Sequence, residues 1–381
     1  LLREHGQLSQ SQLCQMTGLG SSTASSIVSR LREKGLVLES EGKSLKRGPK
    51  PVILQINPRG RFILGLEINP DHVNLGLFDF NTEIIETCRI DLQGDHRVER
   101  VKELLASHVL ELLERHGVDQ AHVLGIGVTL SGTVSADGRV VLASPLGWKN
   151  VPLKADLEAR LACPVSLFGT RVRLLAEMAL EPDASLRNVL YVNVADGVGC
   201  SAVIDGQLLQ GATSRGGEIG HIIVDPQGPR CGCGHTGCLE ALVSGPSMAE
   251  RIHIHAQAQP GSWLGQKIKA DDKHKTIIDK WRLALEGRDE LALEILAYFS
   301  DHLGRALALA VNLYDPELVI LAGYVCMACD PFLMPALEPY IDANVYNSDS
   351  RVINMRPAQA GEHALMIGGA MAVWQHALSQ D

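Results

Sequence analysis

Gly217-Glu-Ile-Gly-His221 is followed, ten residues after the histidine, by Cys231-Gly-Cys-Gly-His-Thr-Gly-Cys238. Three thiols and one imidazole are the donor set of a closed, four-coordinate zinc site. The glycines between the cysteines let the backbone turn tightly enough for all three sulfur atoms to reach one ion. We therefore predict one structural zinc ion per chain, bound by His221, Cys231, Cys233 and Cys238.

Two alternatives stay open for this cysteine segment. His235 could replace His221 as the fourth ligand, although its place inside the cysteine loop makes that geometry harder. Two of the cysteines could instead form a disulfide and leave a spare thiol, which a reducing cytoplasm disfavours. Cys326-Met-Ala-Cys329 also has a C-x-x-C spacing, but without a second pair or a nearby histidine we interpret it as core packing.

Charge divides the chain into two parts. Residues 1–60 contain nine Lys and Arg against four Asp and Glu, a net charge of +5, whereas the other 321 residues carry −14. A basic segment on an acidic body indicates a module that binds a polyanion. With 45% apolar residues and no apolar stretch long enough for a membrane span, the chain is predicted to be globular and cytoplasmic.

The basic segment has the pattern of a winged helix-turn-helix. Ser9 is expected to cap a short helix that ends before Gly18, and a second helix is expected from Ser21 or Ser22. A strand at 36–38, a charged hairpin at 39–48 and a return strand at 51–54 would form the wing. In the second helix a buried stripe is predicted for Ala24, Ile27, Val28 and Leu31.

The outward face of that second helix and the wing are the predicted contacts with double-stranded DNA. We assign the contacts to Ser22, Ser25, Ser26, Ser29, Arg30, Lys46, Arg47 and Lys50. The wing cations are expected to bind phosphate or an A·T-rich minor groove. The alternative is a small helical bundle of the same geometry that binds no DNA.

The acidic body alternates strands and helices in an order that partly repeats. Three closely spaced strands lead into alternating helices and strands, first from Phe62 and again from Asn188. This pattern predicts an α/β protein with two lobes around a ligand-binding cleft.

The zinc segment also carries a family resemblance. Gly217-Glu-Ile-Gly-His221, Asp225-Pro-Gln-Gly and the cysteine loop through Leu239-Glu240 resemble the signature of the ROK family of bacterial sugar kinases and sugar-responsive repressors. The N-terminal winged helix is similar to the repressor branch. The resemblance implies an actin-like (RNase H-like) two-lobe body, a structural zinc, a sugar cleft and a homodimer or homotetramer.

On this resemblance the chain divides into two domains. Residues 1–57 would be the DNA-binding domain and residues 58–381 the effector and oligomerisation domain. Within the second domain, a small lobe would comprise about 58–166 with 365–381, and a large lobe about 167–364.

The resemblance places the sugar contacts at Glu218, His221 and Glu240. Carboxylates accept hydroxyl hydrogen bonds in pairs, as hexose recognition requires. The alternative is that His221 is present only for zinc and that Glu240 only caps the following helix.

The kinase machinery is incomplete at three places. Counted back from Ala176-Glu177, Phe168-Gly-Thr-Arg171 occupies the catalytic segment, so Gly169 stands where the kinases have the aspartate base and Phe168 where they have a polar sugar contact. The first phosphate turn reads Glu67-Ile-Asn-Pro-Asp71, and Pro70 removes an N–H. A second turn is partly kept as Asp196-Gly-Val-Gly199, and a later glycine site reads Gly323-Tyr-Val325.

These losses predict a protein that is not an enzyme. The predicted function is a sequence-specific repressor of genes for sugar metabolism or uptake, controlled by a sugar or sugar phosphate in a non-catalytic cleft. Two alternatives remain: a ROK sugar kinase with an appended DNA-binding domain, and a regulator controlled by a protein partner.

Overall fold

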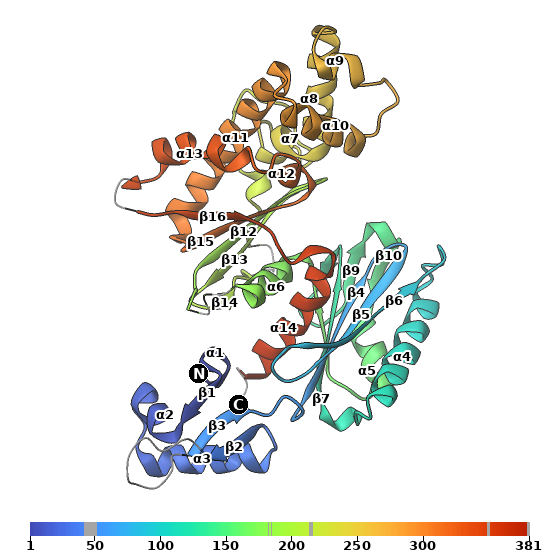
Figure 1. The fold of residues 1–381 in the computed structure, drawn as a ribbon. Coiled ribbons are helices and arrows are strands. Elements are labelled where there is room, and N and C mark those ends of the chain that lie inside the picture. Colours follow the sequence, from blue (N-terminus) through green and yellow to red (C-terminus); the bar gives the residue numbers. More distant parts are fainter. Residues whose placement is uncertain (42–51, 182, 184, 213–215, 349–350, 379–381) are drawn as a thin grey trace. The chain divides into compact units, whose positions relative to one another are not determined.

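The chain folds into two compact units, Leu1–Ser185 with Ala360–Asp381, and Leu186–Gln359 (Figure 1). The structure is a computed structural model that describes residues 1–41, 52–181, 183, 185–212, 216–348 and 351–378. The winged-helix segment belongs to the first unit. The domain and lobe boundaries given above stay predictions.

The N-terminal segment has the predicted winged-helix order, preceded by a helix and a strand that the sequence did not predict. Its elements are α1 (Leu2–His5), β1 (Gln7–Ser9), α2 (Gln10–Thr17), α3 (Ser21–Glu33), β2 (Val37–Glu41) and β3 (Val52–Ile56). Ser9 caps α2 as expected: its Oγ accepts the Gln12 N–H at 3.2 Å, and the Gln12 side chain accepts the Ser9 N–H at 2.7 Å. The unpredicted strand β1 pairs with β3 in the order β1-β3-β2.

One residue of the predicted buried stripe on α3 lies elsewhere. Val28 packs with Val37 and Leu54 in the core of this module, and Ala24 is 5% exposed. Ile27, in contrast, is 40% exposed, so its predicted burial is wrong. It lies three residues after Ala24 and one before Val28, at the edge of the stripe, where the β-strands do not cover it.

The body of the first unit is a five-stranded sheet of order β11-β7-β4-β5-β6. The strands are β4 (Phe62–Ile68), β5 (His72–Phe78), β6 (Ile84–Asp91), β7 (Val123–Leu130) and β11 (Val165–Phe168). Leu64 and Leu66 of β4 face a core shared with α4 (Val98–Arg115) and α5 (Leu153–Leu161). Ile63 faces the opposite core, which is formed with α14 (Ala364–Leu378), as the two-residue period of a strand requires.

Glycines let α14 lie directly on this sheet. A Cβ added at Gly65 would be 2.2 Å from the Met366 carbonyl oxygen, and one at Gly127 would be 2.2 Å from the Gly369 carbonyl oxygen. At its other end α14 meets the winged helix, because the Arg3 guanidinium lies 4.3 Å from the centre of the Trp374 ring. Arg3 also donates to Thr82 Oγ1 at 2.9 Å.

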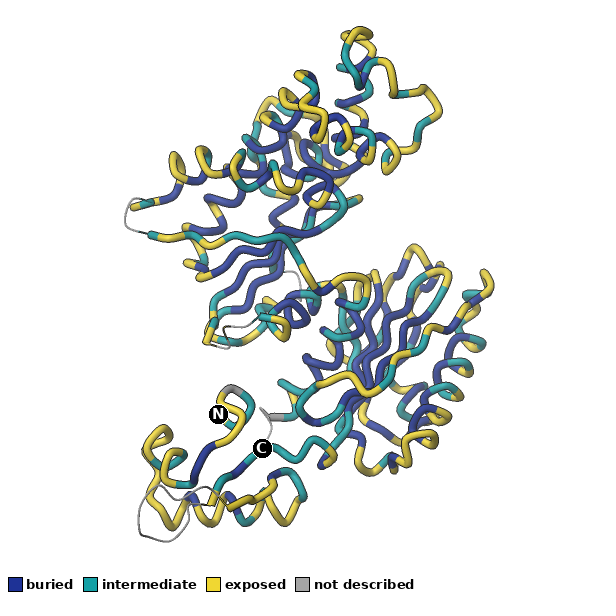
Figure 2. Tube along the Cα trace, in the orientation of Figure 1, coloured by how far each residue is buried: buried dark blue, intermediate teal, exposed yellow. Residues whose placement is uncertain are grey.

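The second unit is built on another five-stranded sheet, of order β14-β13-β12-β15-β16. Its strands are β12 (Val189–Val194), β13 (Val198–Ile204), β14 (Gln207–Leu208), β15 (Leu318–Ala322) and β16 (Asn354–Pro357). The helices are α7 (Leu239–Val243), α8 (Gly245–Ala258), α9 (Trp263–Lys267), α10 (His274–Glu286), α11 (Glu290–Tyr314), α12 (Tyr324–Ala328) and α13 (Leu333–Asn344). Figure 2 shows most of the sheet as buried, whereas the helices alternate between buried and exposed segments.

The predicted repetition of the body is confirmed by the two sheets. In each sheet the first three strands along the chain pair antiparallel, the fourth pairs parallel with the first, and the fifth pairs parallel with the fourth. Numbered along the chain, the strands of each sheet lie side by side in the order third, second, first, fourth, fifth. The sequence did not reveal β16, because Asn354–Pro357 is short and polar. Among the described residues, no helix combines the length and the apolar character needed to cross a lipid bilayer.

Candidate functional site

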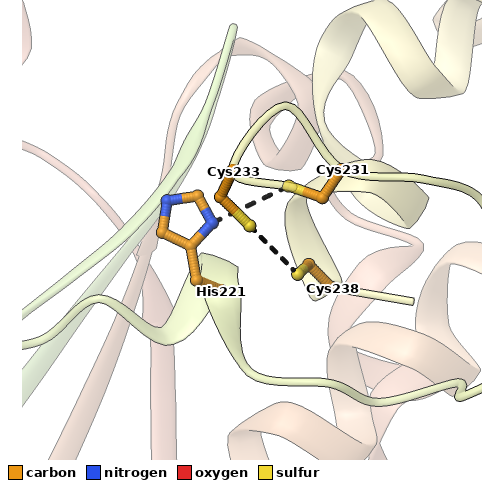
Figure 3. Close-up of side chains that lie close together, drawn as sticks. All are labelled: His221, Cys231, Cys233 and Cys238. Carbon is orange, nitrogen blue, oxygen red and sulfur yellow. Dashed lines mark hydrogen bonds between the residues drawn. The ribbon is translucent and has the colours of Figure 1, made fainter. Parts of the chain in front are cut away.

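The four predicted zinc ligands come together in the second unit (Figure 3). The donor atoms of His221, Cys231, Cys233 and Cys238 all lie within 4.8 Å of one another. The Cys233 and Cys238 sulfur atoms are 3.6 Å apart, and Cys231 Sγ is 3.8 Å from His221 Nδ1. Tetrahedral zinc with bonds of about 2.3 Å to sulfur requires separations near 3.8 Å, whereas a disulfide requires about 2.05 Å. The donor set and its spacing therefore fit one metal ion.

His235 is not part of this group. Its Nδ1 lies 3.5 Å from Cys233 Sγ, and its carbonyl oxygen accepts the Cys231 N–H at 2.8 Å. The pKa of the Cys233 thiol is lowered to about 6, first by a hydrogen bond from the His235 backbone and then by one from the His235 side chain. His235 therefore favours the thiolate form of a neighbouring ligand, while His221 is the histidine that completes the cluster.

The turn of the cysteine loop depends on Gly237. Its φ is +77°, and a Cβ at this position would be 1.6 Å from the Asp225 carbonyl oxygen, so no other residue fits. The loop is closed by hydrogen bonds from Val224 N–H to the Gly237 carbonyl at 2.9 Å and from Gly237 N–H to the Pro229 carbonyl at 2.8 Å. Cys238 follows, fully buried, directly before α7.

The other predicted sugar contacts lie on either side of this loop. Glu218 is exposed and precedes a short 3-10 helix, Ile219–His221, without capping it by its side chain. Glu240 does not cap its own helix α7 either. Its Oε2 accepts the backbone N–H of Val198 at 3.0 Å, so it holds the glycine-rich turn that follows β12.

Two side chains of the second unit contact Asp196 of that glycine-rich turn. The Tyr324 hydroxyl donates to Asp196 Oδ1 at 2.8 Å, and His274 Nε2 lies 3.0 Å from the same oxygen. Burial raises the pKa of Tyr324, so its hydroxyl remains a donor at neutral pH. Gly245 makes room for this tyrosine, since a Cβ there would be 1.7 Å from the hydroxyl. Asp196-Gly-Val-Gly199 and Gly323-Tyr-Val325, two separate sequence motifs, are thus joined by a hydrogen bond.

The turn between β4 and β5 is closed as well. The Asn69 N–H donates to the His72 carbonyl at 2.9 Å, and Pro70 has no N–H to offer. Before the turn, Glu67 is buried and accepts a hydrogen bond from the Asn74 side chain at 3.1 Å. These backbone groups make a tight turn rather than a row of amides open to a phosphate.

At the predicted catalytic position, Gly169 has room for a side chain. Its φ is −82°, and a Cβ would be 3.5 Å from the nearest atom, the Gly132 carbonyl oxygen. Phe168 is half-buried and packs against the α14 cluster that includes Ile63 and Met366. Its side chain is therefore accounted for by core packing.

We expect no binding of Mg²⁺–ATP and no sugar phosphorylation, either by the natural chain or by Gly169→Asp. A restored base contributes about 10²–10⁴-fold only when a γ-phosphate is already bound. Here the Val198 N–H already donates to Glu240, and the Asp196 carboxylate of the same turn accepts a hydrogen bond from Tyr324. Calorimetric titration with Mg²⁺–ATP and a coupled assay with hexoses would check this. Turnover above the no-enzyme control by either chain would contradict it.

On the winged helix, α3 presents only part of the predicted DNA contacts to solvent. Ser22, Ser25, Ser26 and Arg30 are exposed. Ser25 Oγ accepts a hydrogen bond from Gln10 of α2, and the half-buried Ser29 donates to Glu33 at 3.3 Å. Lys46, Arg47 and Lys50 lie outside the described residues. Thr23 and Ile27 also face outward, which the sequence pattern did not predict.

Comparison with known proteins gives two family matches. The model described as "ROK family" matches residues 63–376, and the model described as "MarR family" matches residues 1–43. The xylose repressor of Bacillus subtilis is 24% identical over 99% of this chain and 94% of its own length.

Solved structures match both the whole chain and the body. A ROK family transcriptional regulator, described as a homologue of the Mlc protein of Escherichia coli, is 26% identical with a TM-score of 0.81, over 98% of this chain and 94% of that one. The ROK hexokinase of Thermus thermophilus is 24% identical with a TM-score of 0.69, over 84% of this chain and 99% of that one. The hexokinase match supports the fold of the body alone.

Proposed function

The chain belongs to the ROK family, and from this premise we propose that it is a cytoplasmic transcriptional repressor that binds an operator through its winged helix. The genes it controls would serve sugar metabolism or uptake. Its body would bind a sugar or sugar phosphate without catalysing a reaction on it. One observation carries the proposal. In a chain with a basic winged helix, the glycine-rich turn that kinases use for phosphate is hydrogen-bonded to the protein's own Glu240 and Tyr324.

The proposed effector contacts are Glu218, His221 and Glu240. Glu218 is exposed, and a carboxylate pairs well with neighbouring hydroxyl groups. If zinc takes Nδ1 of His221, the other ring nitrogen remains a donor for a hydroxyl group. Glu240 already accepts the Val198 N–H through Oε2 and has a second oxygen to offer. When bound, the zinc would fix the loop that carries these groups and take part in no reaction.

Control of DNA binding would follow from a two-state equilibrium. A sugar that binds one state of the body more tightly lowers operator affinity by the ratio of its affinities for the two states. A homodimer or homotetramer would present paired winged helices to a two-fold symmetric operator.

The test uses the full chain in two assays. Selection from a random-sequence DNA pool should recover a defined sequence, and thermal unfolding with a panel of sugars and sugar phosphates should show stabilisation by at least one of them. Glu218→Gln should lose that stabilisation and keep DNA binding. A panel without any shift would favour control by a protein partner, and failure to enrich any DNA would contradict a DNA-binding role.

The wing cations provide a prediction about the same DNA. Arg47→Ala and Lys50→Ala should each weaken binding to specific and random duplexes alike, because both residues are proposed to neutralise phosphate. The slope of log affinity against log salt should fall by about one per residue. Binding measured between 50 and 200 mM salt would check this. A change of preference at one base pair with an unchanged slope would instead assign the residue to base recognition.

A further inference from the structure

The three sides of α3 differ in what covers them. Ala24 and Val28 face the core of the winged helix. A second side faces α2, because Gln10 donates to the Ser25 hydroxyl and, at 3.5 Å, to the Ser21 carbonyl oxygen. In the described part of the chain the third side is left to solvent, and it carries Ser22, Thr23, Ser26, Ile27 and Arg30.

Ile27 is the apolar member of this third side. It is 40% exposed, whereas its neighbour Val28 is 8% exposed. Thr23 lies four residues before it and Arg30 three residues after it, so the three side chains form one ridge along α3. A β-branched residue adds little to the stability of an exposed helix. Helix stability therefore does not explain an isoleucine at this exposed position.

The chemistry of the ridge fits the floor of the DNA major groove. In that groove thymine is the base that presents a methyl group, and apolar side chains read it by contact. Arg30 at one end of the ridge and a charge of +5 over residues 1–60 complement the phosphates on either side. An apolar protein partner would not be favoured by that surrounding charge.

We infer that Ile27 is a specificity-determining residue that contacts the 5-methyl group of a thymine in each operator half-site. The inference rests on the proposed DNA-binding function. It also explains how a helix whose other exposed residues are mostly small and polar discriminates between sequences. Two of its serine hydroxyls are already bonded within the protein, those of Ser25 and Ser29.

The experiment combines a protein change with the removal of single methyl groups from DNA. A duplex recovered by the natural chain from a random pool is resynthesised with each thymine replaced in turn by uracil, which lacks the methyl. For the natural chain, one position per half-site should lose about fourfold in affinity, the value of one buried methyl group. For Ile27→Ala that same replacement should cost nothing, while Ile27→Val should retain part of the effect.

Two controls separate this inference from the function on which it rests. Leu19→Ala changes a residue of similar exposure, 39%, that precedes α3, and it should leave the uracil profile unchanged. The salt dependence of Ile27→Ala on random DNA should match that of the natural chain. An identical uracil profile in Ile27→Ala overturns the inference and leaves DNA binding intact. If the natural chain recovers no sequence, the proposed function itself fails.

Discussion

Cys238→Ala should abolish metal binding and lower the free energy of unfolding of the second unit by about 4 kcal/mol or more. A bound ligand stabilises a folded protein by about this amount when its free concentration is about a thousand times its Kd. The natural chain should carry about one zinc ion, measured by elemental analysis. Cys238 is fully buried between the glycine turn and α7. Loss of the ion would remove the bonds that tie His221 to the three cysteines and leave the loop to its hydrogen bonds.

The consequence should reach beyond the loop. Glu240 follows Cys238 by two residues, and its side chain holds the N–H of Val198. Hydrogen exchange of Val198 and its neighbours in β13 should therefore become faster in Cys238→Ala, even though β13 contains no metal ligand.

Cys200→Ala is the matched control for this experiment. Cys200 is a buried thiol on β13 in the same unit, and it lies outside the metal cluster. This variant should keep the zinc and lose only the stability of a small core truncation. Acidification should also release the metal from the natural chain, since the thiols bind as thiolates. A metal-free natural protein with the stability of Cys238→Ala would contradict the assignment.

The contrast between what the sequence predicted and what it missed follows from distance along the chain. The grouping of His221 with the three cysteines was predictable because the four residues fall within 18 residues, where spacing constrains geometry. The hydrogen bond from Tyr324 to Asp196 joins residues 128 positions apart, and that from Val198 to Glu240 joins residues 42 apart. Neither pair has a local pattern, so these contacts of the turn became visible only in the structure.

Ile27 shows a second limit of sequence patterns. Helical spacing placed it beside Ala24 and Val28, but spacing alone does not tell how wide a buried stripe is. The width depends on the neighbouring strands, which reach Val28 and leave Ile27 exposed. Phe168 shows the reverse case. Its place in the segment that matches the kinases' catalytic segment suggested a lost sugar contact. In the structure the Phe168 side chain packs against the cluster formed with α14.

Gly127→Ala should lower the stability of the first unit by about 3 kcal/mol, the upper range of overpacking, and its melting temperature by about 6–12 °C. The new Cβ would lie 2.2 Å from the carbonyl oxygen of Gly369, which is backbone of a helix and cannot rotate away. The helix α14 would have to shift away from β7. Because Trp374 of that helix stacks on Arg3, hydrogen exchange in α1 should also become faster.

Two other glycines of the same unit make this prediction a graded series. A Cβ at Gly125 would meet the side chain of Val373 at 2.8 Å, and one at Gly169 would make an ordinary contact at 3.5 Å. None of the three glycines has a positive φ, so the variants differ in space and not in backbone strain. Calorimetry should rank the losses as Gly127→Ala, then Gly125→Ala, then Gly169→Ala. Equal melting temperatures for Gly127→Ala and Gly169→Ala would show that α14 does not lie against the sheet at Gly127.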